Sequence, residues 1–189
     1  MTTETNIKSI KADVTYWLNS VVIGLNLCPF SHKPTRENRV RLQVSDAIDE
    51  EALLLELADE MALLDASLPD ILETTLLIIP NLLQDFFDYN QFLSWTDSLL
   101  KRNGWKGVYQ LASFHPNYCF AGADENDVEN LTNRAPYPIL HIIREASLAT
   151  ALNYVDTEQI PERNKQCMRE LNPQQRRALF PYLFKTDTH

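Results

Sequence analysis

The pattern of apolar and polar residues divides the start of the chain into a helix and a strand. Apolar residues recur at spacings of three and four between Ile7 and Leu25, which predicts an amphipathic helix that ends near Gly24 or Pro29. Residues 39–45 instead alternate between apolar and polar, as in a strand with one solvated face. We therefore expect a helix that faces the core, followed by an edge strand.

Two further segments are expected to be strands. Residues 74–80 are almost continuously apolar, which is typical of a central strand buried on both faces, and residues 107–114 form the third. Helical patterns that begin near Asp46 and at Asp85 lie between the strands. Because strands that alternate with helices pair in parallel, we predict an α/β fold. It is a three-layer α/β/α sandwich with a small, mainly parallel sheet of about three strands and helices on both faces.

The segment after Pro138 is interpreted as a further helix on the sheet. Nearly all of its residues are apolar except His141, Arg144 and Glu145, which fall at positions i, i+3 and i+4 of a helix. A polar stripe on an otherwise apolar helix is expected to face a cavity or a partner. The alternative is that Arg144 and Glu145 form an ion-pair network that seals the helix to the sheet.

The length of the chain, 189 residues, suits one domain with a sizeable core. We expect a single α/β domain over residues 1–171 and a C-terminal helical tail over residues 172–189, with helix starts near Pro161 and Pro173. The tail mixes basic and apolar residues, so it is expected to dock on the acidic body or on a second copy in a homo-oligomer.

Composition and charge exclude several kinds of partner. A formal net charge of −9 argues against proteins that coat nucleic acid or anionic membranes, since both would repel the chain. No secretory signal or membrane span is apparent. The three cysteines lack the spacing of a disulfide framework, which fits a reducing compartment and predicts a cytoplasmic protein.

The most informative block is a long loop that follows the third strand at His115. The roughly 20 residues before the His141 segment show no periodicity, and such loops in compact domains are usually functional. Ligands of open α/β sheets tend to sit beyond the carboxyl ends of the strands, where His115 is expected. We therefore predict a site within residues 115–145, although His115 also fits a hydrogen-bonded residue at a strand end.

Basic residues in this block suggest an anionic ligand. Asn133 and Arg134 precede the expected helix start, and Arg134 and Arg144 together are expected to clamp a carboxylate or phosphate. His115 or His141 would move protons. The resulting candidate is an enzyme or binding protein for a small anionic metabolite, with Asn133, Arg134, Arg144 and Glu145 as ligand-binding residues.

Cys28, just after the first helix, is a third candidate catalytic residue. It would act as a nucleophile if it reached either histidine, but a free cysteine there also fits a small buried apolar residue. A zinc site is a competing interpretation, because Cys28 and His32 are spaced like His115 and Cys119 in reverse order. No Walker A, GxGxxG, HExxH or GxSxG pattern is present, so the sequence indicates no particular cofactor.

A family resemblance rests on four long blocks, which read GLNLCPF, ETTLLIIPNLLQDFFDYNQFL, QLASFHPNYCFAG and NLTNRAPYPILHIIREAS. From about Ile7 to Leu171 the chain resembles the uncharacterised family known as domain of unknown function 1415. The resemblance implies no established activity. The positions that match the family pattern are Cys28-Pro29-Phe30, His115-Pro116, Asn133-Arg134, His141, Arg144 and Glu145. His32 and Cys119 lie outside that pattern, which weakens the zinc interpretation.

Two classes of function therefore remain open besides zinc binding. A concave pocket with convergent histidines and arginines would support the small-anion site. A flat surface rimmed by exposed aromatic residues would support a non-catalytic protein-interaction module.

Overall fold

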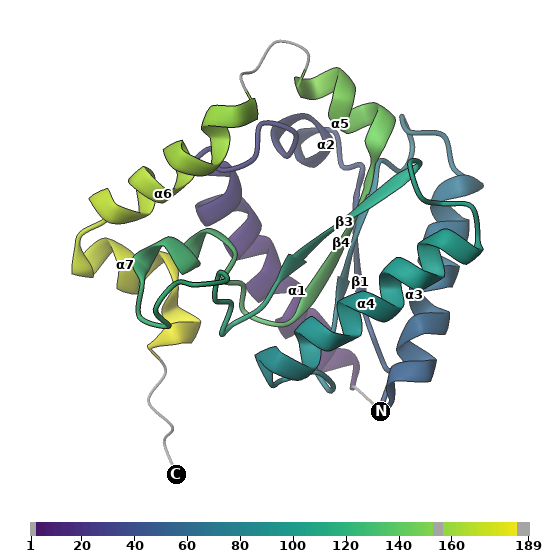
Figure 1. Cartoon of the computed structure of the whole chain (residues 1–189), viewed down its shortest axis with the longest axis horizontal. Helices are drawn as coiled ribbons and strands as arrows, with labels where there is room; N and C mark the ends of the chain where they lie inside the picture. Colours follow the sequence, from purple (N-terminus) through teal and green to yellow (C-terminus); the bar gives the residue numbers. More distant parts are fainter. Residues whose placement is uncertain (1–2, 153–156, 185–189) are drawn as a thin grey trace.

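The computed structural model describes residues 3–152 and 157–184, and a four-stranded sheet forms its centre (Figure 1). The strand order is β1-β2-β4-β3. The strands comprise β1 (Val40–Val44), β2 (Thr74–Ile78), β3 (Tyr109–Phe114) and β4 (Ile139–Arg144). β1 and β2 pair in parallel, whereas β4 runs antiparallel to both of its neighbours. The three strands predicted from the sequence therefore point the same way, and β4 is inserted between two of them.

β4 corrects the interpretation of the His141 segment as a helix. Helix α5 (Glu145–Leu152) begins only after this strand. A short apolar run bounded by Pro138 fits a buried strand as well as a helix, and β4 has neighbours on both edges. The α/β class is confirmed. The predicted sandwich does not match, because the sheet is mixed, has four strands and uses the His141 segment as one of them.

Two helices pack on one face of the sheet. Helix α3 (Glu50–Asp65) and helix α4 (Phe86–Arg102) share an apolar cluster with Leu77, Leu140 and Ile142 of the sheet. The predicted cap is confirmed for α4, where the Asp85 side chain accepts hydrogen bonds from two backbone N–H groups. For α3 the cap is Asp49, three residues after the predicted Asp46.

The opposite face is covered by the N-terminal helices and the C-terminal segment. They comprise α1 (Glu4–Trp17), the π-helical η1 (Leu18–Ile23), α2 (His32–Arg36), α6 (Ile160–Glu170), α7 (Pro173–Leu179) and the 3-10 turn η4 (Pro181–Leu183). Trp17 of α1 and Phe180 after α7 are both buried in the cluster on this face. The predicted C-terminal tail therefore packs on the body as far as it is described, and residues 185–189 lie outside the described part.

Two further 3-10 turns lie in the connections, η2 (Val128–Thr132) and η3 (Thr157–Gln159). Ion pairs from Lys165 and Arg169 of α6 to Glu129 tie α6 to η2.

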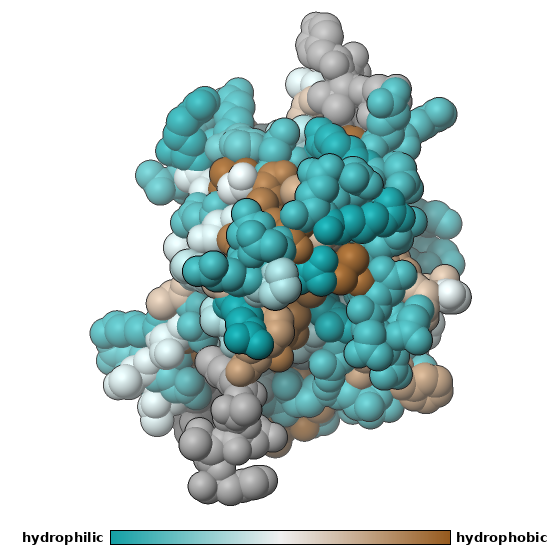
Figure 2. Space-filling model, turned by 90° about the vertical axis from the view of Figure 1, so that its left-hand side faces the viewer, coloured by the Kyte–Doolittle hydropathy of each residue, from teal (hydrophilic) through white to brown (hydrophobic). Residues whose placement is uncertain are grey.

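The face of the molecule that carries α6 and α7 is largely hydrophilic, with apolar atoms visible in small areas between polar side chains (Figure 2). Within the described ranges, no helix combines the length and apolar character needed to cross a membrane.

Candidate functional site

His115 lies at the end of β3 on the side of α4, fully buried beneath the surface. Its ring packs on Phe86 and Tyr89, with centroids 5.3 and 5.2 Å away. Burial lowers the pKa of His115, so the ring is neutral. Its Nδ1 accepts the backbone N–H of Asn117 at 3.0 Å, which leaves Nε2 to donate to the carbonyl of Leu83 at 3.1 Å. Both nitrogens are occupied, as in the alternative interpretation of a hydrogen-bonded residue at a strand end.

His141 lies on the opposite face of the sheet from His115. Thr74 donates its hydroxyl proton to the carbonyl of Ile142 at 2.5 Å, so its oxygen accepts from His141 Nε2 at 2.7 Å. Burial lowers the pKa of His141 to about 4, which keeps the ring neutral near pH 7. Its other surroundings include Phe30 and Pro34, which line the same narrow space. The two histidines therefore do not converge on one site.

Arg144 supports the end of helix α3. Its Nη2 donates to the backbone carbonyls of Leu64, Ser67 and Leu72 at 2.5, 2.9 and 3.2 Å. The guanidinium also lies over the ring of Tyr109, 5.8 Å from its centroid. Its Nη1 donates to the Tyr109 hydroxyl at 3.3 Å, whereas Nε is buried without a hydrogen-bond partner in the described residues. Arg144 lines neither of the two cavities described below, so these contacts indicate a structural role.

Arg134 organises the loop at the other end of β4. Its Nε donates to the carbonyl of Tyr118 at 3.2 Å and its Nη2 to that of Glu125 at 2.7 Å. The length of β4 separates Arg134 from Arg144, and five steps along a strand span about 17 Å. The structure therefore does not bring the two arginines together as the predicted clamp requires.

Asn133 and Glu145 lie at connections between elements. The Asn133 side chain donates to the carbonyl of Ser113 at 3.2 Å, and its own carbonyl accepts the backbone N–H of His115. Glu145 begins α5, and its backbone N–H donates to the carbonyl of Val108. Asn133 thus fastens the end of the loop to β3.

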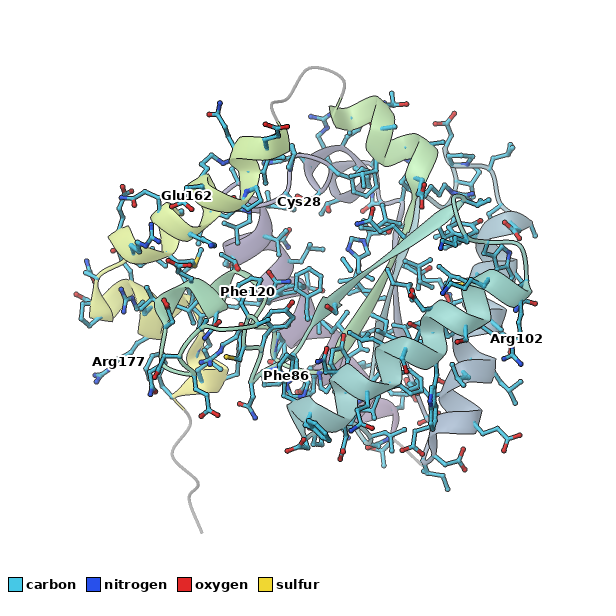
Figure 3. All side chains as sticks on the ribbon, viewed as in Figure 1. Cys28, Phe86, Arg102, Phe120, Glu162 and Arg177 are labelled. Atoms are coloured by element: carbon cyan, nitrogen blue, oxygen red, sulfur yellow. The ribbon has the colours of Figure 1, made fainter. Side chains whose placement is uncertain are left out.

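Cys28 packs, partly buried, against the apolar cluster on the α1 face. Burial raises the pKa of its thiol, so the group is protonated near neutral pH. Figure 3 shows Cys28 well apart from Phe86, the residue that packs on His115. These observations fit the interpretation of Cys28 as a small apolar residue.

The four candidate zinc ligands are not brought together. His32 instead lies 3.2 Å from the Asn26 side-chain oxygen through its Nε2. Over residues 3–152 and 157–184, no three His, Cys, Asp or Glu side chains gather in a way that would hold a metal ion. The zinc interpretation therefore gains no support.

The long loop is well packed, as expected. Fully buried Asn130 accepts the backbone N–H of Phe120 and donates to the carbonyls of Asp124 and Glu125. A cleft of about 560 Å³ lies between this loop and the start of α4, with Arg134 in its lining. His115 is buried and does not contribute to the lining of the cleft.

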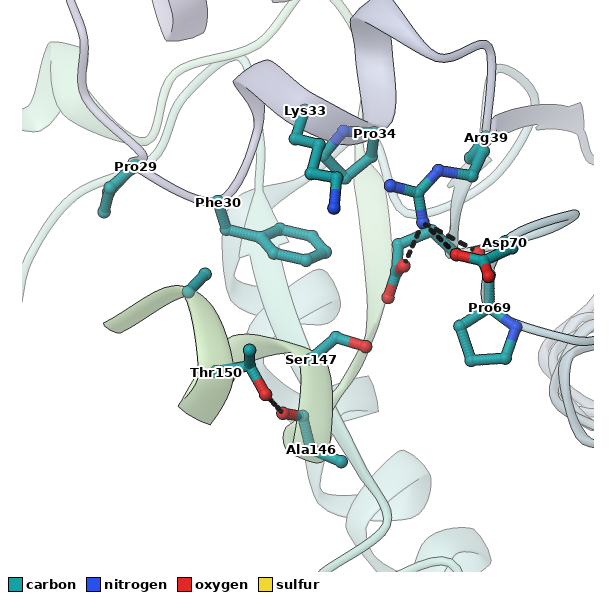
Figure 4. Close-up of a pocket in the computed structure, with 12 residues that line it drawn as sticks. Pro29, Phe30, Lys33, Pro34, Arg39, Pro69, Asp70, Ala146, Ser147 and Thr150 are labelled. Atoms are coloured by element: carbon teal, nitrogen blue, oxygen red, sulfur yellow. Dashed lines mark hydrogen bonds and ion pairs between the residues drawn. The ribbon is translucent and has the colours of Figure 1, made fainter. Parts of the chain in front are cut away.

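A second cavity, of about 360 Å³, lies at the other end of the sheet (Figure 4). It is enclosed by residues 29–39, the loop over 69–73 before β2, and the first turns of α5. Sequence reasoning placed no ligand here. The site lies beyond the amino ends of the parallel strands β1 and β2. Ligands of open α/β sheets usually bind beyond the carboxyl ends of the strands, so a site at this end was not expected.

A buried ion pair between Arg39 and Glu73 forms one wall of this cavity. Their side chains are only 7% and 6% exposed, and Arg39 Nη1 lies 2.7 Å from Glu73 Oε2. Arg39 also contacts Glu37 at 2.6 Å and Asp70 at 3.8 Å. Arg39 Nε and Glu73 Oε1 are buried without a hydrogen-bond partner in the described residues. The wall therefore retains unused hydrogen-bonding capacity.

The mouth of the cavity carries a cation and a hydroxyl. Lys33 is exposed there and forms no ion pair with any described residue, and the Ser147 hydroxyl points toward the interior (Figure 4). Phe30 presents its ring to the same space. The cavity thus combines charged, hydroxyl and apolar groups in one place.

The positions of Arg39 and Glu73 in the sequence could have predicted their ion pair. Each residue stands directly before a strand, and the parallel register pairs Val40 with Thr74. Opposite charges that immediately precede paired parallel strands become neighbours, so the pairing of β1 and β2 would have predicted this contact.

Fold and cavity together define an α/β protein with a mixed sheet and a ligand-sized pocket at one sheet end. The chain belongs to the family described as Protein of unknown function (DUF1415), whose model matches residues 9–178. No curated protein and no solved structure matches the chain. The case for a function therefore rests on the site itself.

Proposed function

We propose that the protein binds a small anionic metabolite in the cavity beside α5. The single observation that carries this proposal is Lys33, a cation without an ion-pair partner among the described residues, at the mouth of a ligand-sized cavity. A volume of about 360 Å³ falls within the usual range of small-molecule sites.

Charge distribution supports Lys33 as the group that contacts the anion. The neighbouring cations are occupied, because Arg36 lies 3.8 Å from Glu37 and Arg39 is held by Glu37 and Glu73. A lysine ammonium is a point charge with three donors, which suits a carboxylate or a phosphate. The proposal thus keeps the predicted ligand class and moves its site from the Arg134 and Arg144 pair to Lys33.

Apolar residues around the cavity suit the carbon skeleton of such a ligand. Phe30, Pro34 and Pro69 line it together with the polar groups. Phe30 and Pro34 also line the narrow space around His141, so they stand between that imidazole and the cavity. We therefore propose binding and assign no reaction.

A thermal-shift panel of carboxylate and phosphate metabolites tests this proposal. A ligand at about 100 times its Kd adds roughly 2.7 kcal/mol to the free energy of unfolding. The stabilisation should be strongly reduced in Lys33→Ala and retained in Lys106→Ala, a control that removes an exposed lysine outside the cavity lining. Equal stabilisation of Lys33→Ala, or no hit in the panel, would overturn the proposal, and the second outcome would favour a macromolecular partner.

A further inference from the structure

The geometry points to a zwitterionic ligand of the amino-acid type, with its protonated amine at Glu73 and its anionic group at Lys33. This inference rests on the proposed function and names the ligand class for the same cavity. Three features of the cavity carry it: the unused oxygen of Glu73, the balance of charge in the wall, and the apolar surface between the two charged groups.

The first feature is the second carboxylate oxygen of Glu73. Oε2 is bound by Arg39 at 2.7 Å, whereas Oε1 is buried and has no partner in the described part of the chain. Buried polar atoms in native proteins are almost always hydrogen-bonded, so an orphan acceptor requires an explanation. Because Glu73 lines the cavity, a donor group on a bound ligand supplies one.

The second feature is the sign of the charge in the wall. The guanidinium of Arg39 is approached by three carboxylates, those of Glu37, Asp70 and Glu73. Arg36 is the only other cation paired with this group in the described residues, through Glu37. Arg36 and Asp70 are largely exposed, at 75% and 97%, so solvent screens their charges. The one buried cation, Arg39, is therefore shared by two close carboxylates, Glu37 at 2.6 Å and Glu73 at 2.7 Å, which leaves an excess of negative charge beside the cavity.

This residual negative charge discriminates between ligands. A simple anion bound at Lys33 would meet the unneutralised carboxylate charge deeper in the same cavity, which disfavours it. A ligand that also carries an ammonium group gains attraction at both positions. A zwitterion therefore matches the cavity better than an acid without an amine.

The third feature is the lining between the two charged positions. Phe30 and Pro34 offer apolar surface, and the Ser147 hydroxyl points into the space (Figure 4). Such a lining suits a short methylene chain between an amine and an acid group. A small amino acid thus satisfies each part of the cavity.

Isothermal titration calorimetry with matched ligand pairs tests the inference. One series runs from glycine to 6-aminohexanoate, and the other consists of the alkanoates of the same length, acetate to hexanoate. We expect at least one amino acid to bind the parent protein at least tenfold more tightly than its matched alkanoate. Equal affinities within every pair would overturn the zwitterion while the proposed anion site survives.

Variants separate the two ends of the ligand. Glu73→Gln should abolish the tenfold preference, Lys33→Ala should weaken both members of the pair, and Lys106→Ala should change neither. A tenfold preference that persists unchanged in folded Glu73→Gln would overturn the assignment of the amine. If Glu73→Gln does not fold, the comparison of matched pairs on the parent protein decides. Binding that is insensitive to Lys33→Ala would overturn the proposed function as well. Absence of binding in both series would overturn the zwitterion alone, because the anion site is tested separately with phosphates in the thermal-shift panel.

Discussion

The two ends of the sheet use their polar residues in different ways. At the carboxyl ends of β2 and β3, His115, Asn130 and Arg134 are engaged by backbone groups that shape the long loop. At the amino ends of β1 and β2, Arg39 and Glu73 are paired yet keep unpartnered atoms. In the described ranges, none of the buried side-chain atoms without a partner belongs to the lining of the Arg134 cleft.

This contrast separates polar residues that hold the fold from polar residues that are available to a ligand. Where the donors and acceptors are engaged by the fold, or where an unpartnered atom such as Arg144 Nε lines neither cavity, the side chain holds the fold and a ligand has little to gain from it. Where capacity remains beside a cavity, a ligand can supply the missing partner. Substitutions of Arg144, His115 and Cys28 and one pH series test this distinction.

The largest loss of stability is expected for Arg144→Ala. Loss of the guanidinium leaves the carbonyls of Leu64, Ser67 and Leu72 without their donor, which should lower the free energy of unfolding by about 3 kcal/mol. Urea denaturation measures this loss. Arg144→Lys should lose less, because it keeps a charged donor. A stable Arg144→Ala variant that no longer binds the ligand would instead restore the anion-binding role predicted from the sequence.

A smaller loss is expected for His115→Phe. The ring remains to pack on Phe86 and Tyr89, but the hydrogen bonds with Leu83 and Asn117 disappear, which should cost about 2 kcal/mol. Ligand affinity of the folded protein should be unchanged. The control His32→Ala removes an exposed ring and should stay within about 0.5 kcal/mol of the parent. Equal stability of His115→Phe and the parent would contradict a structural role.

The lowered pKa values of His115 and His141 predict a loss of stability in mild acid. His141 has a pKa of about 4 in the folded protein and about 6.5 when unfolded, so between these values the unfolded state binds more protons. The contribution of the neutral His141 to the free energy of unfolding is complete above pH 6.5 and falls as the pH drops toward 4. For His141 the loss between pH 6.5 and 5.5 should be about 1 kcal/mol. The lowered pKa of His115 acts in the same direction.

Urea denaturation at a series of pH values between 6.5 and 5.5 measures this loss of stability. His141→Gln keeps a donor for Thr74 but cannot titrate, so its stability should fall less steeply than that of the parent. Identical slopes for the two proteins would show that His141 is not the residue responsible.

Much of the fold follows from the sequence because its strands and helices have clear periods. Alternation in 39–45 predicted the edge strand β1, and the apolar run in 74–80 predicted the internal strand β2. The β4 segment was misjudged because a central strand is apolar on both faces and loses the alternation that marks a strand. As a result, His141 and Arg144 were placed on one helical stripe, although they lie on opposite faces of the sheet.

The candidate site was less predictable for a different physical reason. The partners of Arg144, Arg134 and His115 are mostly backbone carbonyls from other elements, and a carbonyl leaves no mark on residue identity. The sequence therefore shows a cluster of polar side chains but not whether they are already occupied. For Arg39 and Glu73 the partner is a side chain, so strand pairing would have revealed the contact.

The smallest loss of stability is expected for Cys28→Ala, which tests a residue on the α1 face of the sheet that we interpret as a small apolar side chain. Removal of one partly buried sulfur should change the free energy of unfolding by about 0.5 kcal/mol and leave ligand affinity unchanged. The thiol of the folded protein should also react with iodoacetamide at least tenfold more slowly than in urea, because burial raises its pKa and hinders access. Rapid alkylation near neutral pH would indicate a thiolate stabilised by a neighbouring cation or imidazole. Since no such partner lies within hydrogen-bonding distance among the described residues, that result would require a rearrangement around Cys28 and would reopen the nucleophile hypothesis.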